Sequence, residues 1–183
     1  MPIFESVVIA AVFIVGASII FSTLKIGISP MPSSKKAYQA IIALADETGT
    51  GPIYDLGSGW GSLVIRLARE YPDRQIVGYE LSLFPWLTTK IIKRVLGLSN
   101  LVVHREDFLK ADLSGATVIT CYLFPAAMAE IESKLKHGKG KLRFIISNNF
   151  ALPSYQACKV VQLNDFYQSP VYLYHMTLRT SQV

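Results

Sequence analysis

The sequence is poor in cysteine, which narrows the kinds of site it can hold. Its 183 residues include Cys121 and Cys158 alone, and neither belongs to a Cys-x-x-Cys or Cys/His pattern. A disulfide framework needs several paired cysteines, and a structural zinc site needs clustered cysteine or histidine ligands. We therefore expect no metal site and no disulfide framework, a composition typical of a reducing compartment.

Clustered positive charge is also scarce. The chain has 18 Lys and Arg against 13 Asp and Glu, a net charge of +5, and the basic residues are spread along it. Proteins that bind nucleic acid usually carry a basic stripe or patch. The sequence therefore predicts no nucleic-acid partner, while its modest basic surplus suits an anionic membrane surface.

Charge is missing altogether from Ser6 to Leu24. These 19 residues are rich in Val, Ile, Ala and Phe. A helix of that length, at about 1.5 Å per residue, matches the hydrocarbon thickness of a bilayer. A secretory signal would need a basic start and a small-residue cleavage site, and neither is present. We expect residues 1–24 to be a retained membrane anchor; a cleaved signal and a buried or interfacial helix are the alternatives.

The residues after this run indicate how the chain is organised. Lys25, Lys35 and Lys36 follow it closely. By the positive-inside tendency, these lysines place the rest of the chain on the cytoplasmic side of a single-pass membrane protein. Two prolines predict an extended linker over residues 25–34. Residues 35–183 are then long enough for one domain and too few for two.

Beyond the linker, apolar strand-like segments alternate with amphipathic helix-like ones. Strands are expected at 52–56, 75–81, 101–104, 117–122, 141–147, 159–163 and 171–178, and helices at 34–46, 62–71, 85–96 and 126–136. Such alternation is typical of a parallel sheet with helices on both faces. The last two strands are too close for a helix between them, which predicts an antiparallel hairpin. The expected fold class is α/β, a doubly wound sheet with a C-terminal antiparallel hairpin.

The stretch Tyr54-Asp55-Leu56-Gly57-Ser58-Gly59-Trp60-Gly61 is the most informative part of the sequence. It follows a predicted strand and opens a predicted helix, and its alternate glycines permit a tight turn against a ligand. Asp55 lies two residues before the first glycine. A carboxylate there would repel the pyrophosphate of a dinucleotide but attract the ammonium group of a sulfonium amino acid.

A second acid, Glu80, ends the next predicted strand, 19 residues after Gly61. A carboxylate at that place can accept hydrogen bonds from both hydroxyls of a ribose. Together, Asp55, the glycine loop and Glu80 favour S-adenosylmethionine as the ligand. NAD and a degenerate nucleotide site are the alternatives.

These residues resemble the motifs of the class I S-adenosylmethionine-dependent methyltransferases, which have a Rossmann-like fold. The resemblance implies that the loop grips the methionine part of the donor and that Glu80 binds its ribose. It also implies that Asp107, just past the third strand, contacts the adenine amine; an ordinary polar turn is the alternative reading. The loop residues so implied are Asp55, Gly57, Ser58, Gly59 and Gly61.

A narrower resemblance extends over nearly all of the chain after the apolar run. Its motifs are Met31-Pro32-Ser33-Ser34-Lys35, the glycine loop, Gly78-Tyr79-Glu80-Leu81, Pro85-Trp86-Leu87, Pro125, Phe150-Ala151-Leu152-Pro153 and Val171-Tyr172-Leu173-Tyr174. This pattern is similar to that of the small membrane-anchored protein-lysine methyltransferases. Mitochondrial members of that family modify the ATP synthase c-subunit and the adenine nucleotide translocase. The resemblance implies a lysine acceptor on a membrane protein.

The acceptor side depends on fewer residues. Tyr122 ends the fourth predicted strand, where the superfamily places groups that contact the acceptor, and we expect it to position the acceptor. Methylation of a lipid or a quinone is an alternative, because a membrane anchor would serve it equally well. A non-catalytic, membrane-tethered protein that binds the donor nucleoside is another.

Overall fold

The computed structural model describes residues 4–6, 8, 9, 16, 34–136 and 140–176. Within these ranges, no helix is both long and apolar enough to cross a bilayer. The anchor predicted for residues 1–24 falls mostly outside the described residues, and so does the linker predicted for residues 25–34. The described part of the chain is mainly the α/β domain.

Strands and helices alternate through this domain, each within three residues of the bounds expected from the sequence. The strands are β1 (Ile53–Leu56), β2 (Ile76–Tyr79), β3 (Leu101–His104), β4 (Val118–Cys121), β5 (Phe144–Asn148), β6 (Lys159–Gln162) and β7 (Pro170–His175). The helices are α2 (Lys35–Asp46), α3 (Ser62–Glu70), α4 (Leu83–Val95) and α5 (Pro125–Lys136).

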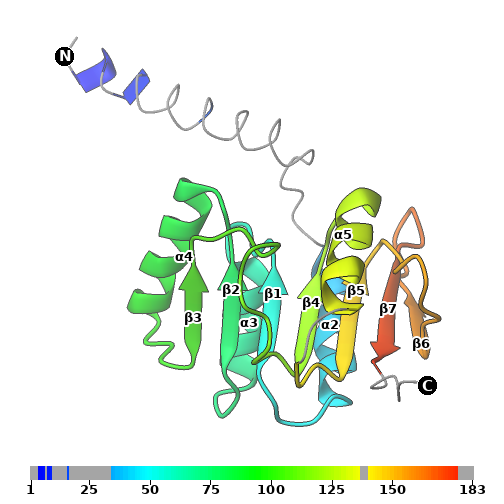
Figure 1. Cartoon of the computed structure of the whole chain (residues 1–183). Coiled ribbons are helices and arrows are strands. Elements are labelled where there is room, and N and C mark those ends of the chain that lie inside the picture. The colour runs from blue at the N-terminus through cyan, green and yellow to red at the C-terminus, as the bar shows by residue number, and fades with distance from the viewer. Residues whose placement is uncertain (1–3, 7, 10–15, 17–33, 137–139, 177–183) are drawn as a thin grey trace.

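These strands form one sheet in the order β3-β2-β1-β4-β5-β7-β6. β1 to β5 are parallel, and their carboxyl ends share the upper edge of the sheet in Figure 1. β7 is antiparallel to both β5 and β6, so the predicted C-terminal hairpin is confirmed. The later strand of the hairpin lies next to β5, and the earlier one forms the outer edge.

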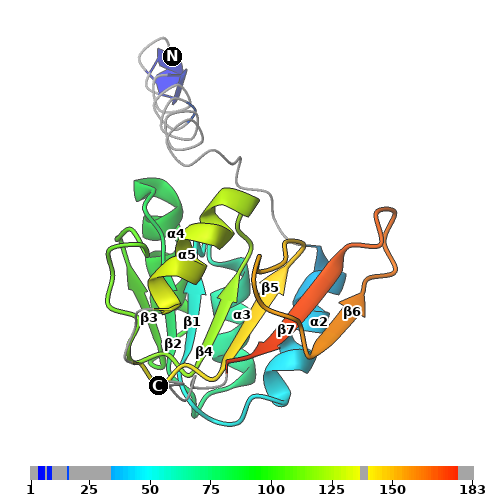
Figure 2. The ribbon, with the colours of Figure 1, turned by 45° about the vertical axis from the view of Figure 1, so that its right-hand side comes forward.

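Apolar clusters fill both faces of the sheet, as the alternating pattern predicts. On one face, Ile41 of α2 and Leu67 of α3 pack with Ile146 of β5 in a fully buried cluster. On the other face, Met128 of α5 packs with Ile145, the neighbour of Ile146 in the same strand. Because successive residues of a strand point to opposite faces, β5 contributes to both clusters. Figure 2 shows α5 on one side of the sheet and α2 and α3 on the other.

Capping residues define where the helices begin and end. The Ser34 hydroxyl accepts a hydrogen bond of 3.1 Å from the Ala37 N–H and so starts α2. α4 begins at Leu83, two residues earlier than the position of Pro85 suggests. Proline is compatible with the whole first turn, because the N–H groups there have no partner within the helix. Gly97, with a φ of 64°, follows the end of α4.

The glycine loop and α4 approach each other so closely that one residue must lack a side chain. Gly61 is the N-cap of α3 and has a φ of 79°. A Cβ atom there would lie 2.4 Å from the Oγ1 atom of Thr89 in α4. Thr89 is fully buried, and its hydroxyl donates to the Pro85 carbonyl, so it has little freedom to move away. Gly61 therefore fixes the distance between the loop and α4.

Replacing Gly61 by alanine is expected to destabilise the domain by about 2–5 kcal/mol, from the positive φ and the clash with Thr89 together. Gly49 is a matched control, because its φ of 77° is similar and nothing lies within 4 Å of its absent Cβ. Gly49→Ala should cost about 1–2 kcal/mol, the conformational part alone. Urea unfolding of the two variants measures the difference, and equal losses would show that the close packing contributes nothing.

Candidate functional site

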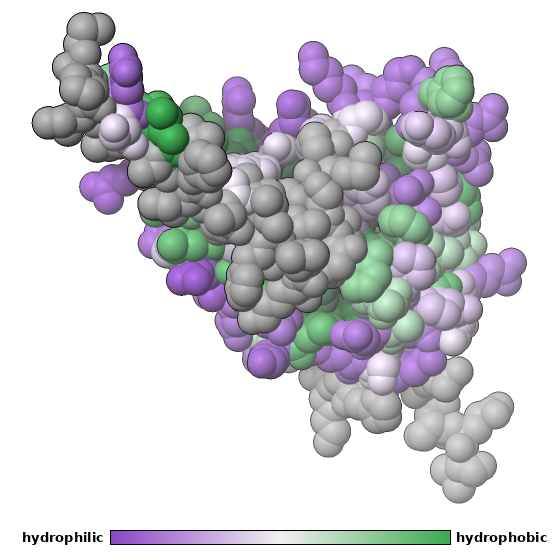
Figure 3. Space-filling view, turned by 90° about the horizontal axis from the view of Figure 1, so that it is seen from above, coloured by the Kyte–Doolittle hydropathy of each residue, from purple (hydrophilic) through white to green (hydrophobic). Residues whose placement is uncertain are grey.

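The carboxyl edge of the parallel strands brings the predicted site residues together. The glycine loop follows β1, Glu80 follows β2 and Tyr122 follows β4. β1 pairs with both β2 and β4, so these three segments are neighbours at one edge. Figure 3 looks down on this edge, where hydrophobic surface in green is interspersed with hydrophilic surface in purple. In open α/β sheets, ligands bind at this edge.

The loop after β1 turns tightly around the end of β2. Gly57 and Gly59 have φ values of 76° and 53°, a left-handed backbone that favours glycine. The N–H groups of Gly57 and Ser58 both donate to the Tyr79 carbonyl, at 3.0 and 2.8 Å. The Ser58 hydroxyl oxygen is buried and has no hydrogen-bond partner within the chain. An unsatisfied buried hydroxyl is costly, so this group is available to a ligand in the loop.

Glu80 connects the loop to α4 through its side chain. Its Oε2 atom accepts from the Gly59 N–H at 2.9 Å, and its Oε1 atom accepts from the Ser82 N–H at 2.7 Å. The residue is 8% exposed. A carboxylate has about four acceptor positions, so two backbone bonds leave acceptor capacity on both oxygens. This arrangement is what a pair of ribose hydroxyls requires.

Asp55 is a buried carboxylate at the end of β1. Its Oδ1 atom accepts a hydrogen bond of 2.7 Å from the Thr120 hydroxyl on β4. Burial raises the pKa of Asp55 to about 7, Thr120 opposes that rise, and the negative charge of Glu80 adds to it. None of these groups is a cation. A positively charged ligand group would therefore find two acids whose charge the nearby protein groups do not balance.

Some residues in this arrangement were not expected from the sequence. Thr120 lies opposite Asp55 in the β1–β4 register, and its only signal is a polar residue within the apolar strand Val118–Cys121. Ser82 is the N-cap of α4 and binds Glu80 through its backbone. A backbone donor has no sequence signature, so its role is visible only in the structure.

Asp107 lies in the loop after β3 and is half-buried. Its Oδ1 atom accepts from the Leu109 N–H at 3.0 Å, so the carboxylate stabilises its own turn. The Lys134 ammonium of α5 fixes the same loop by donating to the carbonyls of Phe108, Leu109 and Ala111. A contact of Asp107 with adenine remains a prediction, made from a loop that is held in place.

The acceptor side has an aromatic pair. The rings of Tyr122, after β4, and Phe150, after β5, are stacked with centroids 6.1 Å apart. Trp86 belongs elsewhere: its indole N–H donates to the Val103 carbonyl of β3, and Lys90 lies over its ring. Tyr122 therefore has an aromatic neighbour that the sequence did not indicate, and Trp86 is tied to the edge strand.

The chemistry of this edge fits S-adenosylmethionine. The donor has a ribose, for which Glu80 has free acceptor capacity, and an ammonium group that two acids would attract. Among the residues that the structure describes, no three His, Cys, Asp or Glu side chains are placed to hold a metal ion. The donor set near the loop consists of carboxylates, a hydroxyl and backbone groups.

Comparisons with known proteins agree with this chemistry. A family model described as "ANTKMT methyltransferase domain" matches residues 55–159. A protein-lysine N-methyltransferase of Saccharolobus islandicus is 24% identical over 148 residues, which are 79% of this chain and 91% of that protein. The adenine nucleotide translocase lysine N-methyltransferase of Mus musculus is 32% identical over 114 residues, which are 61% of this chain and 48% of that protein. The chain thus matches about half the length of the mouse relative.

Solved structures share the fold. An RNA methyltransferase from Salinibacter ruber in complex with S-adenosyl-L-homocysteine is similar with a TM-score of 0.72 and 26% identity, covering 84% of this chain and 98% of that one. The magnesium protoporphyrin IX methyltransferase from Synechocystis PCC 6803 with bound S-adenosylmethionine has a TM-score of 0.61 and 17% identity, covering 78% and 79%. The second likeness concerns the fold alone.

Asp55→Asn is expected to raise the stability of the free protein while it weakens donor binding. The pKa of Asp55 is raised above that of an unfolded chain, so the native state binds more protons between about pH 4 and 7. Stability is therefore lost as the pH rises through that window, by up to about 4 kcal/mol. Asparagine is neutral and still accepts from Thr120, so thermal unfolding at pH 8 should show a gain that disappears near pH 4.

The same group gives donor binding a pH dependence. Below pH 7 the Asp55 carboxyl is protonated and loses its attraction for an ammonium group, so wild-type affinity should fall by up to about tenfold per pH unit. Calorimetry from pH 5.5 to 7.5 measures this slope, and Asp55→Asn should be weaker and flat across the range. A wild-type affinity independent of pH would contradict the role given to Asp55.

For Glu80, a double-mutant cycle tests binding to the ribose. We expect Glu80→Gln, and separately a donor analogue that lacks one ribose hydroxyl, each to weaken binding, and the two losses together to be smaller than their sum. The reason is that both changes remove the same hydrogen bond. Glu106→Gln, an exposed acid, serves as control and should leave donor affinity unchanged. Losses that simply add would place the ribose away from Glu80.

Proposed function

Because this chain belongs to the family of the ANTKMT methyltransferase domain and is an S-adenosylmethionine-dependent methyltransferase, we propose that its acceptor is a lysine side chain of a membrane protein. Two relatives of this chain are named as lysine methyltransferases, and one of them acts on the adenine nucleotide translocase. The lysine is the chemical class on which both names agree. The membrane location is the additional part of the proposal.

The aromatic pair of Tyr122 and Phe150 is the observation that carries a lysine acceptor. The two half-buried rings are stacked at the carboxyl ends of β4 and β5, the edge that also holds the donor loop. A lysine has a reference pKa of about 10.4 and must be neutral to attack a methyl group. Removal of the amine from water favours its neutral form, so an aromatic entry assists the reaction without a dedicated base.

The remaining chemistry is alignment. S-adenosylmethionine supplies a methyl group on a positively charged sulfur. The chain binds the two ends of the donor through Asp55 and Glu80, which restricts its orientation, and Tyr122 with Phe150 directs the acceptor towards the same edge. Holding two reactants in line supplies much of the rate enhancement in such direct transfers.

The uncharged run from Ser6 to Leu24 supports a membrane location. We infer that it tethers the domain as a single-pass anchor, with the domain on the cytoplasmic side. The linker over residues 25–34 spans at most about 35 Å when extended. Such a tether raises the effective concentration of neighbouring membrane proteins, whereas a soluble acceptor would gain nothing from it.

Other acceptor classes are outcomes of the test. The anchor would serve a lipid or quinone equally well. The Salinibacter ruber structure, at 26% identity, belongs to an RNA methyltransferase. The chemistry of the entry favours an amine over these, because the aromatic pair offers apolar surroundings and no cluster of cations for phosphates.

Labelling of total membranes with a tritiated methyl donor should place the label on protein, and acid hydrolysis should release it as methyl-lysine. Glu80→Ala provides the matched control, because it removes the ribose acceptor and should reduce label to background. Mass spectrometry of membrane proteins from cells with and without the enzyme should then show methyl-lysine lost at one or few sites. Label that extracts with lipid, or that ribonuclease releases, would replace the lysine by the corresponding acceptor.

A further inference from the structure

Helix α4 has an apolar face where a surface helix normally has a charged one. Leu83, Leu87, Ile91 and Val95 are all exposed, with Ile91 at 56% and Val95 at 78%. They recur every four residues, which on an α-helix keeps them on one side. The residues by which α4 is buried, Pro85 and Thr89, lie on the opposite side. We call these four residues the α4 stripe.

Positive charge accompanies the α4 stripe. Lys90, Lys93 and Arg94 are on the same helix, and residues 81–105 contain no Asp or Glu at all. An exposed apolar stripe flanked by cations of one sign is the pattern of a helix that lies in the interface of an anionic membrane. A helix that packs against another protein core would rarely keep three uncompensated cations beside its contact face.

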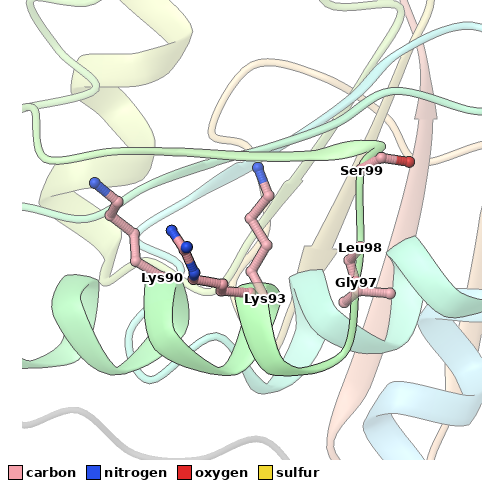
Figure 4. A pocket seen from close by; sticks show the side chains of 6 residues that line it. Lys90, Lys93, Gly97, Leu98 and Ser99 are labelled. Carbon is pink, nitrogen blue, oxygen red and sulfur yellow. The ribbon is translucent and has the colours of Figure 1, made fainter.

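A hollow of about 350 Å³ lies beside the stripe, at the end of α4. Its lining consists of Lys90, Lys93, Arg94, Gly97, Leu98 and Ser99. Figure 4 shows the side chains of Lys90 and Lys93 extending to the same side of α4. Lys90 also lies over the Trp86 ring, 4.6 Å from its centroid, which holds one wall of the hollow in place. Its size and charge suit a phosphate-bearing headgroup.

From these observations we propose that α4 docks on the surface of an anionic bilayer. The α4 stripe enters the boundary between headgroups and acyl chains, and the basic hollow receives anionic headgroups. The inference depends on residues of α4 and its following loop, and it stands whether or not the acceptor is a lysine.

Docking through α4 has a direct connection to the donor site. The N-cap of α4 is Ser82, whose N–H donates to Glu80 at 2.7 Å. Gly61 of the donor loop packs on Thr89, on the buried side of the same helix. A bilayer that holds the exposed side of α4 therefore fixes the orientation of the donor site relative to the membrane.

The test uses the full chain with an environment-sensitive fluorophore at Ile91→Cys. The exposed Cys158 is changed to serine, and the buried Cys121 is kept. With vesicles that contain phosphatidylserine, the fluorophore should shift to the blue and be quenched by brominated acyl chains, and it should do neither with phosphatidylcholine alone. A fluorophore at Ala43→Cys, an exposed position on α2, is the control and should remain in water with both.

Charge is tested by Lys90→Gln, Lys93→Gln and Arg94→Gln together. Each basic residue contributes about fivefold to binding at an anionic surface, so the triple variant should weaken insertion of position 91 by about 100-fold. Circular dichroism and donor binding check that the variant is folded.

Several results would overturn the proposal. An unchanged fluorophore with both kinds of vesicle would show that α4 stays in water. Insertion that the triple variant retains would show that charge is not involved. Protection in phosphatidylcholine that rises with the protein-to-lipid ratio would make a second copy the occupant, and protection independent of that ratio would mean another segment covers the stripe.

Discussion

The site depends on one carboxylate that joins three elements. Glu80 follows β2, accepts from Gly59 in the loop after β1, and accepts from Ser82 at the start of α4. These contacts set the loop, the strand end and the helix in one geometry before any ligand binds. The clash-limited packing of Gly61 on Thr89 holds the same loop from its other side. Binding energy from the donor is therefore available for alignment and is not needed to order the loop.

The same edge concentrates negative charge without a protein cation to balance it. Asp55 is buried, its pKa is raised to about 7, and Glu80 is among the causes. Such an arrangement costs stability in the free protein and is favourable when a positively charged ligand arrives. This is the electrostatic reason why a sulfonium amino acid suits the site and a pyrophosphate does not. The fold and the donor class follow from the same few side chains.

Much of this could be predicted from the sequence, because the signals are local. Apolar runs locate the strands to within three residues, and the spacing of Asp55, the glycines and Glu80 indicates the donor. Contacts across the sheet could not be predicted, because they depend on register: Thr120 meets Asp55 only once β1 and β4 are aligned. The stacking of Tyr122 on Phe150 likewise joins two strand ends 28 residues apart. The order of β6 and β7 is also a tertiary choice, since either strand of a hairpin can pair with β5.

That order has a consequence for how the chain acquires its structure. β5 is a central strand whose free side is covered by Pro170–His175, the last strand in the chain. While the polypeptide is being synthesised, the backbone N–H and C=O groups on that side of β5 have no partner until almost every residue has left the ribosome. An open strand edge invites pairing with other chains. The sheet therefore closes last at its C-terminal end, and nascent or truncated forms that lack β7 expose an apolar strand to aggregation.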